Sequence, residues 1–373
     1  MGAHPSSPSG LTRGGHRTTL DQVIAADPAA ELGPGCAARF GSRLSFLLKI
    51  LAPEQALSIQ VHPDRGQAEA GYQAENERGI PLRDRARNYV DDWPKPELLC
   101  AVTRFEVLAG FRPTEDIRAL LAALGTTVLQ PVAVMLSLGG DPRLDALKAL
   151  LTWPPDQRAA LQHDVLAGCA RLTAAGGEYA AACAAVLRIA ADHPGDPGVV
   201  AALLLNYQVL EPGDAVFMAA GGLHAYIKGV GVELLANSDN VLRAGLTAKH
   251  VDVPELLRLT DPSVAVPVIK PRQVSPATVT YDTPAPEFRL YRMTLAAPET
   301  ARPDEARPDE VLPDAGPRIV CCLAGAATLR SQAGGAATLA RGESCFVPAS
   351  DGPVTVTAAA DATLFVAAST CSG

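Results

Sequence analysis

Four side chains that can bind a metal ion lie in three separate stretches of this sequence. Gln60 and His62 stand two residues apart in SIQVHPD, Glu97 lies in KPELL, and His224 lies in GGLHAY. Alternate residues of a β-strand point to one face, so a strand here would direct Gln60 and His62 to the same side, about 7 Å apart. Imidazole, carboxylate and amide groups are ligands of divalent cations. Taken singly, each of these residues is more typical of ordinary polar surface, or of a hydrogen-bonded histidine in the core, than of a metal site.

The local sequence favours fixed backbone positions for two of these residues. The prolines of PKPE restrict the chain just before Glu97, and paired glycines allow a tight turn just before His224.

The eight cysteines show no CxxC pair and no regular spacing. We expect them to be small, buried and reduced, so a metal ion must be bound by histidine, carboxylate or amide groups.

Strands are predicted around the candidate ligands. One covers residues 42–51, and a turn leads into ALSIQVHPD, which Pro63 ends. Further strands are predicted at 97–103 and 105–108. Residues 64–96 are polar and rich in Arg, Asp, Glu and Gly, which predicts a long excursion over the surface.

A helical region is predicted to interrupt the strands. Thr114 can cap a helix that has one apolar face, formed by Ile117, Leu120, Leu121 and Leu124. Helical pattern continues to about residue 192, where DHPGDPG ends it.

Strand pattern resumes at VVAALLLNYQVL, from residue 199. After about residue 262, short strands separated by Pro and Gly are typical of a sandwich or jelly roll. Within them, PETARPDEARPDEVLPDAGP predicts a mobile loop without function.

Bulk composition narrows the class of protein. With 373 residues and 48% hydrophobic content, the chain can form two or three domains. A formal charge of -8 with scattered basic residues argues against nucleic acid or an anionic membrane as a partner. The opening MGAHPSSPSGLTRGGHRTT is polar and predicted to be flexible, and no apolar run suits a signal peptide or a bilayer span. We therefore expect a cytoplasmic protein.

Several of these segments together resemble the type I mannose-6-phosphate isomerases. They are MGAHPSSPS, SIQVHPD, RNYVDDWPKPELL, LLLNYQVLEPGD and HAYIKGVGVELLANSDNVLRAGLTAKHVDVPELL, in the order of that family. The resemblance implies a mainly β fold with an α-helical insert and two cupin-like jelly rolls. The implied domains are a catalytic jelly roll at 1–112 and 200–261, a helical insert at 113–199, and a C-terminal jelly roll at 262–373.

The resemblance also implies the metal and the reaction. It makes Gln60, His62, Glu97 and His224 the ligands of one zinc ion per chain. Two neutral imidazoles, one amide and one carboxylate would leave a net charge near +1, so the ion remains a Lewis acid. The implied enzyme interconverts mannose 6-phosphate and fructose 6-phosphate by metal-assisted proton transfer between C1 and C2.

Two further residues, Arg243 and Glu233, match positions of the family near the reacting atoms, and Lys95 is a third candidate because of its place in the sequence. Arg243 in NVLRAGLTAK suits a developing oxyanion or the phosphate. Glu233 in GVELLANSDN is a candidate proton carrier, with a structural ion pair to Arg243 or Lys249 as the alternative. Lys95, two residues before Glu97, is another candidate base, because a nearby divalent cation would favour its neutral form.

The phosphate group has its own candidates. Ser58 and Lys249 match family positions that bind the dianion, and Lys49 on the neighbouring strand is a further candidate. No Gly-rich nucleotide-binding motif occurs. We expect a small-molecule sugar phosphate as the partner and a monomeric chain.

Two other readings remain at this point. One is a metal-dependent cupin of another class, such as an iron oxygenase. The other is a sugar-phosphate-binding protein without catalysis. Relatives carry an earlier strand region ahead of MGAHPSSPS, so we expect Met1 to be an internal methionine of a longer parent and the catalytic jelly roll to expose an unpaired edge.

Overall fold

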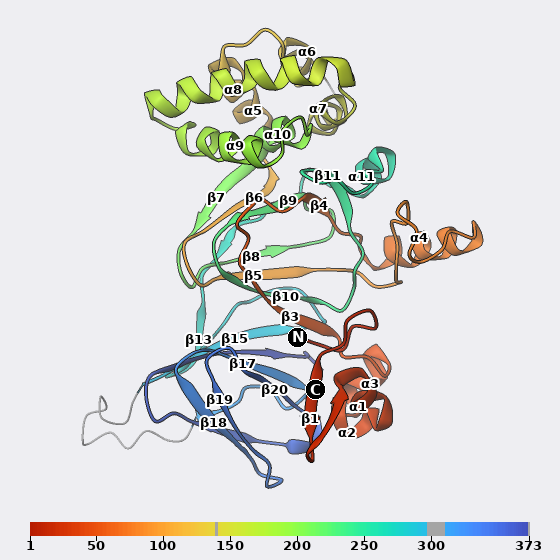
Figure 1. Cartoon of the computed structure of the whole chain (residues 1–373), viewed down its shortest axis with the longest axis vertical. Coiled ribbons are helices and arrows are strands. Elements are labelled where there is room, and N and C mark those ends of the chain that lie inside the picture. Colours follow the sequence, from red (N-terminus) through yellow and green to blue (C-terminus); the bar gives the residue numbers. More distant parts are fainter. Residues whose placement is uncertain (139–140, 297–309, 372–373) are drawn as a thin grey trace.

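The computed structural model describes residues 1–138, 141–296 and 310–371. Figure 1 shows three regions along the long axis: a helical region at one end, a β-sandwich in the middle and a second sandwich at the other end. This confirms the predicted mainly β fold with a helical insert and two jelly-roll-like units. No helix among the described residues has the length and apolar character needed to cross a bilayer.

The first sandwich consists of two facing five-stranded antiparallel sheets. Their strand orders are β12-β8-β5-β10-β3 and β11-β4-β9-β6-β7. The strands are β3 (Phe46–Leu51), β4 (Ile59–Val61), β5 (Glu97–Ala101), β6 (Phe105–Phe111), β7 (Leu205–Leu210), β8 (Ala215–Met218), β9 (His224–Lys228), β10 (Gly231–Ala236), β11 (Leu242–Gly245) and β12 (Val268–Ile269). Leu99, Val107, Val216 and Met218 belong to the apolar core between these strands. Strands distant in sequence thus lie side by side, because neighbours in each sheet are mostly not consecutive.

The helical insert caps the sheet that contains β4. Its helices are α5 (Thr114–Leu124), α6 (Gln130–Met135), α7 (Pro142–Leu151), η1 (Pro155–Gln157), α8 (Arg158–Ala175), α9 (Ala180–Asp192), α10 (Gly198–Ala201) and η2 (Ala202–Leu204). Ile59 and Val61 share one core with the buried face of α5. That face is the one predicted for the helix beginning near residue 114. Thr114, however, does not cap it: Pro113 takes the cap position, without a side-chain hydrogen bond.

The predicted strand at residues 199–204 is wrong, because this run is helical. Every residue of α10 and η2 is buried between the other helices and the sheet. A segment buried on all sides shows no periodicity that would distinguish a short helix from a strand. Strand structure begins only at β7.

Residues near the start of the chain are also ordered, contrary to the prediction of a flexible opening. They form the hairpin β1 (Gly10–Arg13) and β2 (His16–Thr19), followed by α1 (Leu20–Ala26), α2 (Pro28–Leu32) and α3 (Pro34–Phe40). The backbone of Met1 exchanges hydrogen bonds with that of Leu48 on β3, an end strand of its sheet. Leu20 and Ile24 pack with Phe288 and Phe365, so these helices contribute to the core between the two sandwiches.

Two helices lie in segments without a predicted helix. The excursion at residues 64–96 contains α4 (Arg65–Glu77), which begins with a capping box in which Asp64 and Gln67 bond reciprocally. Only Ala68 and Glu75 of α4 are buried, so its apolar periodicity is weak. The helix α11 (Val253–Leu259) is capped by the Asp252 side chain. In Figure 1, α4 projects from the side of the first sandwich.

The second sandwich follows β12. Its sheets have the orders β13-β14-β15-β22-β17-β20 and β16-β21-β18-β19. The elements are β13 (Arg272–Ser275), β14 (Thr278–Thr280), β15 (Arg289–Leu295), β16 (Glu310–Val311), β17 (Arg318–Ala324), β18 (Ala326–Ser331), β19 (Ala336–Ala340), β20 (Ser344–Val347), η4 (Ala349–Asp351), β21 (Val354–Thr357) and β22 (Ala362–Ala368). Residues 298–309 of the predicted mobile loop lie outside the described residues.

Candidate metal centre

Three candidate ligands converge inside the first sandwich. His62 follows β4, His224 begins β9, and Glu97 begins β5 in the facing sheet. The Nε2 atom of His62 lies 3.1 Å from Oε1 of Glu97, and the Nε2 atom of His224 lies 3.4 Å from Oε2. Candidate ligand atoms of these three residues all lie within 4.8 Å of one another, which is close enough to share one ion.

Backbone carbonyl groups orient both imidazole rings. Nδ1 of His62 lies 2.8 Å from the carbonyl oxygen of Asn240, and Nδ1 of His224 lies 3.0 Å from that of Gly222. A carbonyl can only accept, so each Nδ1 carries the proton and each Nε2 presents a lone pair. Nε2 of His62 is buried and makes no hydrogen bond with the described residues. An orphaned acceptor of this kind fits a metal ligand.

A glycine turn places His224. Gly221 has φ +79°, a conformation that side chains other than glycine rarely adopt. A Cβ at this position would also lie 3.0 Å from Cβ of Asp261 and 3.2 Å from the carbonyl oxygen of Leu259. The turn therefore requires glycine, in agreement with the expectation drawn from GGLH.

Gln60 lies beside the three converging residues. It pairs with His224 across β4 and β9, and its Nε2 atom is 3.3 Å from Nε2 of the imidazole. The assignment of oxygen and nitrogen in an amide can be exchanged by rotating its terminal group. Gln60 can therefore present its amide oxygen to an ion held by His62, Glu97 and His224.

Burial and nearby charge fit this donor set to a divalent cation. Burial lowers the pKa of His62 to about 4, so the ring is neutral near pH 7. Burial alone would raise the pKa of Glu97, but neighbouring positive charge, including that of Lys95, outweighs this effect and holds the pKa well below its usual value. The Lys95 ammonium is 3.3 Å from Oε1, and the Tyr226 hydroxyl donates to Oε2 at 3.3 Å. The result is an ionised carboxylate beside neutral imidazoles.

Glu233 lies near this group, on the same sheet as Glu97. It faces Lys49 across β10 and β3, with Oε2 3.5 Å from the ammonium nitrogen. The expected alternative pairing with Arg243 or Lys249 is wrong, since the ion pair is made with Lys49. Glu233 is 4% exposed, and burial, followed by the charge of Glu97, raises its pKa to about 7. This carboxyl group can exchange a proton near neutral pH.

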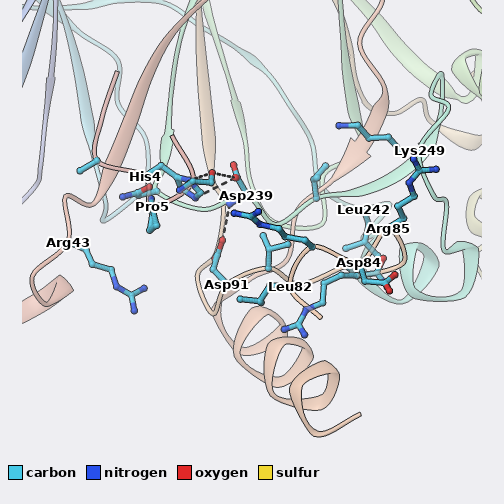
Figure 2. A pocket seen from close by; sticks show the side chains of 18 of the residues that line it. His4, Pro5, Arg43, Leu82, Asp84, Arg85, Asp91, Asp239, Leu242 and Lys249 are labelled. Carbon is cyan, nitrogen blue, oxygen red and sulfur yellow. Dashed lines mark hydrogen bonds and ion pairs between the residues drawn. The ribbon is translucent and has the colours of Figure 1, made fainter. Parts of the chain in front are cut away.

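A cavity of about 1140 Å³ (Figure 2) is lined in part by Leu242 and Arg243 of β11, the strand that pairs with β4. Arg243 and Lys249 line it, whereas Ser58, Lys49 and the three converging ligands do not. Arg243 on β11 lies opposite Gln60 on β4, which places both side chains on one face of the sheet. Arg243 thus lies between the cavity and the candidate metal centre.

The same cavity shows one residue that the sequence analysis missed. Arg85 lines it with Lys249, and Figure 2 shows both side chains at one end. Across the described residues, neither they nor Arg243 make an ion pair. By contrast, Arg87 pairs with Glu75. The available signal was the arginine-rich run LRDRAR, which was assigned to the surface.

Comparisons with known proteins agree with this geometry. Residues 1–114 match the family described as phosphomannose isomerase type I, catalytic domain. The mannose-6-phosphate isomerase of Salmonella typhimurium is 36% identical over 95% of this chain and 87% of its own length. The isomerase of Escherichia coli is 35% identical, also over 95% of this chain and 87% of its own length. That of Bos taurus is 32% identical over 79% of this chain and 71% of its own length. A solved zinc-bound mannose 6-phosphate isomerase has TM-score 0.85 and 32% identity, over 99% of this chain and 90% of that one.

Proposed function

The chain belongs to the type I phosphomannose isomerase family, and we infer from that membership that it interconverts mannose 6-phosphate and fructose 6-phosphate. The cofactor is one zinc ion per chain, as the zinc-bound neighbour and the His–Glu–His group of this chain support. One observation carries the inference: His62, Glu97 and His224, from three distant segments, meet within 4.8 Å in a buried site.

The zinc ligands we propose are Gln60, His62, Glu97 and His224. The unpartnered Nε2 of His62 and the ionised carboxylate of Glu97 support the assignment, as does the position of the Gln60 amide beside Nε2 of His224. When bound, zinc supplies Lewis acidity that favours negative charge on the sugar oxygens. No other group of His, Cys, Asp and Glu side chains in the described ranges has comparable ligand spacing.

Glu233 is our first candidate for the proton carrier between C1 and C2. Its pKa of about 7 suits both release and uptake of a proton, and Lys49 can stabilise its ionised form. Lys49 would also contact the substrate on this side of the site. Lys95 is the second candidate, but its ammonium group already forms an ion pair with Glu97 at 3.3 Å. Arg243 would stabilise charge on the substrate oxygen.

The phosphate group would bind at the cavity end of the site. Lys249 and Arg85 line the cavity, and neither forms an ion pair with any residue that the structure describes, so their two positive charges can be directed to a dianion. Ser58 lies two residues before Gln60 and immediately before β4, and could donate its hydroxyl from there. The sugar would then extend from the cavity past Arg243 toward the metal ligands.

We assign catalysis to residues 1–112 and 200–261, and structural roles to the insert 113–199 and to residues 262–373. All candidate site residues fall in the first unit, which supports this division. We further propose a cytoplasmic location, since the eight cysteines are unpaired, and a monomeric state. Sedimentation of the purified chain tests the last point.

A coupled assay for conversion of mannose 6-phosphate to fructose 6-phosphate tests the proposed function. We expect activity in the zinc-loaded protein, loss of activity on chelation, and recovery when zinc is restored. A zinc-loaded chain that binds the sugar phosphate but does not convert it would contradict the assignment.

A further inference from the structure

Asn240 holds the carbonyl oxygen that orients His62, and its own position is unusually constrained. The residue is fully buried, and its carbonyl oxygen lies 2.8 Å from Nδ1 of His62. It belongs to the short connection between β10 and β11, away from the strands that carry the candidate ligands. Something other than a sheet ladder must therefore fix this carbonyl group in space.

The Asn240 side chain is bound on both of its polar atoms by the segment that precedes Glu97. Its Nδ2 donates to the carbonyl oxygens of Asp91 at 2.8 Å and Trp93 at 2.9 Å. Its Oδ1 accepts from the backbone N–H of Val90 at 2.9 Å. These bonds satisfy both ends of a buried amide, so rotation or displacement of Asn240 would leave several polar groups unpaired.

The Asp91 carboxylate completes this network. Its Oδ1 accepts from the Ser238 hydroxyl at 2.8 Å and from the backbone N–H of Trp93 at 3.0 Å. Its Oδ2 accepts from the backbone N–H of Asp239 at 2.9 Å. Ser238 in turn accepts from the Asn240 backbone N–H at 3.1 Å. We call the set Asp91, Trp93, Ser238 and Asn240 the Asp91–Asn240 clamp.

The clamp joins two loops that lead to different parts of the centre. The loop at residues 90–93 continues through Lys95 into Glu97, and the loop at 237–240 continues into β11 and Arg243. The Asn240 carbonyl connects the same network to His62. One set of hydrogen bonds therefore controls the relative positions of an imidazole ligand, a carboxylate ligand and the arginine beside the cavity.

We propose that Asp91 and Asn240 are positioning residues of the metal centre, which act through the His62 ring without touching the ion. The inference rests on the proposed function, because it takes His62 and Glu97 to be zinc ligands. Residues that hydrogen-bond to metal ligands typically change metal affinity by about 10–100-fold when they are replaced. The clamp predicts an effect in this range from side chains that make no contact with the ion.

Two substitutions of nearly unchanged shape test the clamp in the full-length chain. Asn240→Asp removes the Nδ2 donors and places a carboxylate against two carbonyl oxygens. Asp91→Asn replaces one acceptor oxygen by an NH2 group among several N–H and O–H donors. Asp92→Asn is the matched control, because Asp92 is the next residue, is outside the clamp, and among the described side chains forms its ion pair with the exposed Arg43.

Zinc affinity is measured by competition with a chromogenic chelator. We expect the dissociation constant to rise about 10–100-fold in Asn240→Asp and to a smaller extent in Asp91→Asn, with no change in Asp92→Asn. Unchanged affinity in both clamp variants would overturn the proposal. Failure of the wild-type chain to bind zinc would instead overturn the proposed function, so the two failures are distinguishable.

A second measurement separates positioning from a general loss of stability. The imidazole ¹⁵N resonances of the metal-free chain report which ring nitrogen carries the proton. We expect the His62 signals of the wild-type and Asp92→Asn chains to show the Nδ1–H form, and those of Asn240→Asp to show a mixture of tautomers. If the variant unfolds at lower denaturant concentration but retains both the His62 tautomer and zinc affinity, the clamp is only structural and the proposal fails.

Discussion

Arg243 and Gln60 are directly paired residues of the antiparallel strands β11 and β4, and their side chains share one face of the sheet. The Gln60 amide lies 3.3 Å from Nε2 of His224, while Arg243 lines the cavity that also contains Lys249. Arg243 is half-buried and makes no ion pair among the described side chains. Its guanidinium group is therefore free to bind a negatively charged substrate oxygen between the metal centre and the cavity.

The first prediction concerns Arg243→Ala. We expect kcat to fall about 100- to 1000-fold, the usual effect of removing one donor to a developing oxyanion, with unchanged bound zinc. Steady-state kinetics and metal analysis of the same preparation provide the measurement. Arg272→Ala, an exposed arginine of the second sandwich, is the control and should retain full activity. Loss of zinc together with activity would show that Arg243 has a structural role.

Arg85→Ala tests the cavity end of the site. We expect KM for mannose 6-phosphate to rise about 10-fold, as for loss of a charge-assisted hydrogen bond, with little change in kcat. Competitive inhibition by inorganic phosphate should weaken in parallel. Arg78→Ala removes an exposed arginine from the end of α4 and should change neither value. An equal KM in the Arg85→Ala and Arg78→Ala variants would show that Arg85 does not bind the phosphate.

Metal removal should also lower stability. A ligand that binds only the folded state adds about 4 kcal/mol when its free concentration is 1000 times its dissociation constant. We therefore expect the melting temperature to drop on chelation and to recover with zinc. His62→Ala should show no zinc-dependent shift, whereas His16→Ala, in the β1–β2 hairpin, should behave as the wild type. A persistent shift in His62→Ala would place the zinc elsewhere.

The raised pKa of Glu233 leads us to expect that the stability of the metal-free chain depends on pH. Its carboxyl group ionises at about 7 when folded, against the usual value of 4.5, because burial and Glu97 oppose the charge. Between these pH values the folded state holds the extra proton, so its stability falls as pH rises, by about 3 kcal/mol in all.

Denaturant unfolding of the metal-free wild-type and Glu233→Gln chains at pH 4.5 and pH 8 measures this loss as the difference between the two chains, because His62, with a pKa lowered to about 4, changes the stability of both chains in the opposite direction. We expect Glu233→Gln to remove most of it, because an amide cannot ionise. Glu54→Gln, at an exposed position, should leave it unchanged. An identical difference between the two pH values in the wild type and in Glu233→Gln would contradict the raised pKa of this group.

The candidate ligands could be named from the sequence because several segments together resemble one family, although each residue taken singly is more typical of ordinary polar surface or core. Alternation along β4 put Gln60 and His62 on one side, and the glycines before His224 indicated the turn that Gly221 makes with φ +79°. Arg85 could not be selected in the same way. Its role depends on a cavity formed with Lys249, and no local pattern links two loops separated by more than a hundred residues.

The same limit explains the errors in the fold. The helical run α10–η2 is buried on every side, so its apolar residues carry no periodicity, and α4 depends on a capping box instead of an apolar face. The Lys49 partner of Glu233 was missed because the pairing of β3 with β10 is a contact across the whole catalytic unit.

By itself, the sequence determined the fold class, the family resemblance and the identity of the residues able to bind a metal, because short-range periodicity and turn residues record such features directly. Only the tertiary structure decided which of these side chains meet, which of them are neutral or charged, and how Asp91 and Asn240 orient His62. The physical reason is that ligand distances, burial and electrostatic shifts all arise from contacts between strands and loops far apart in the chain.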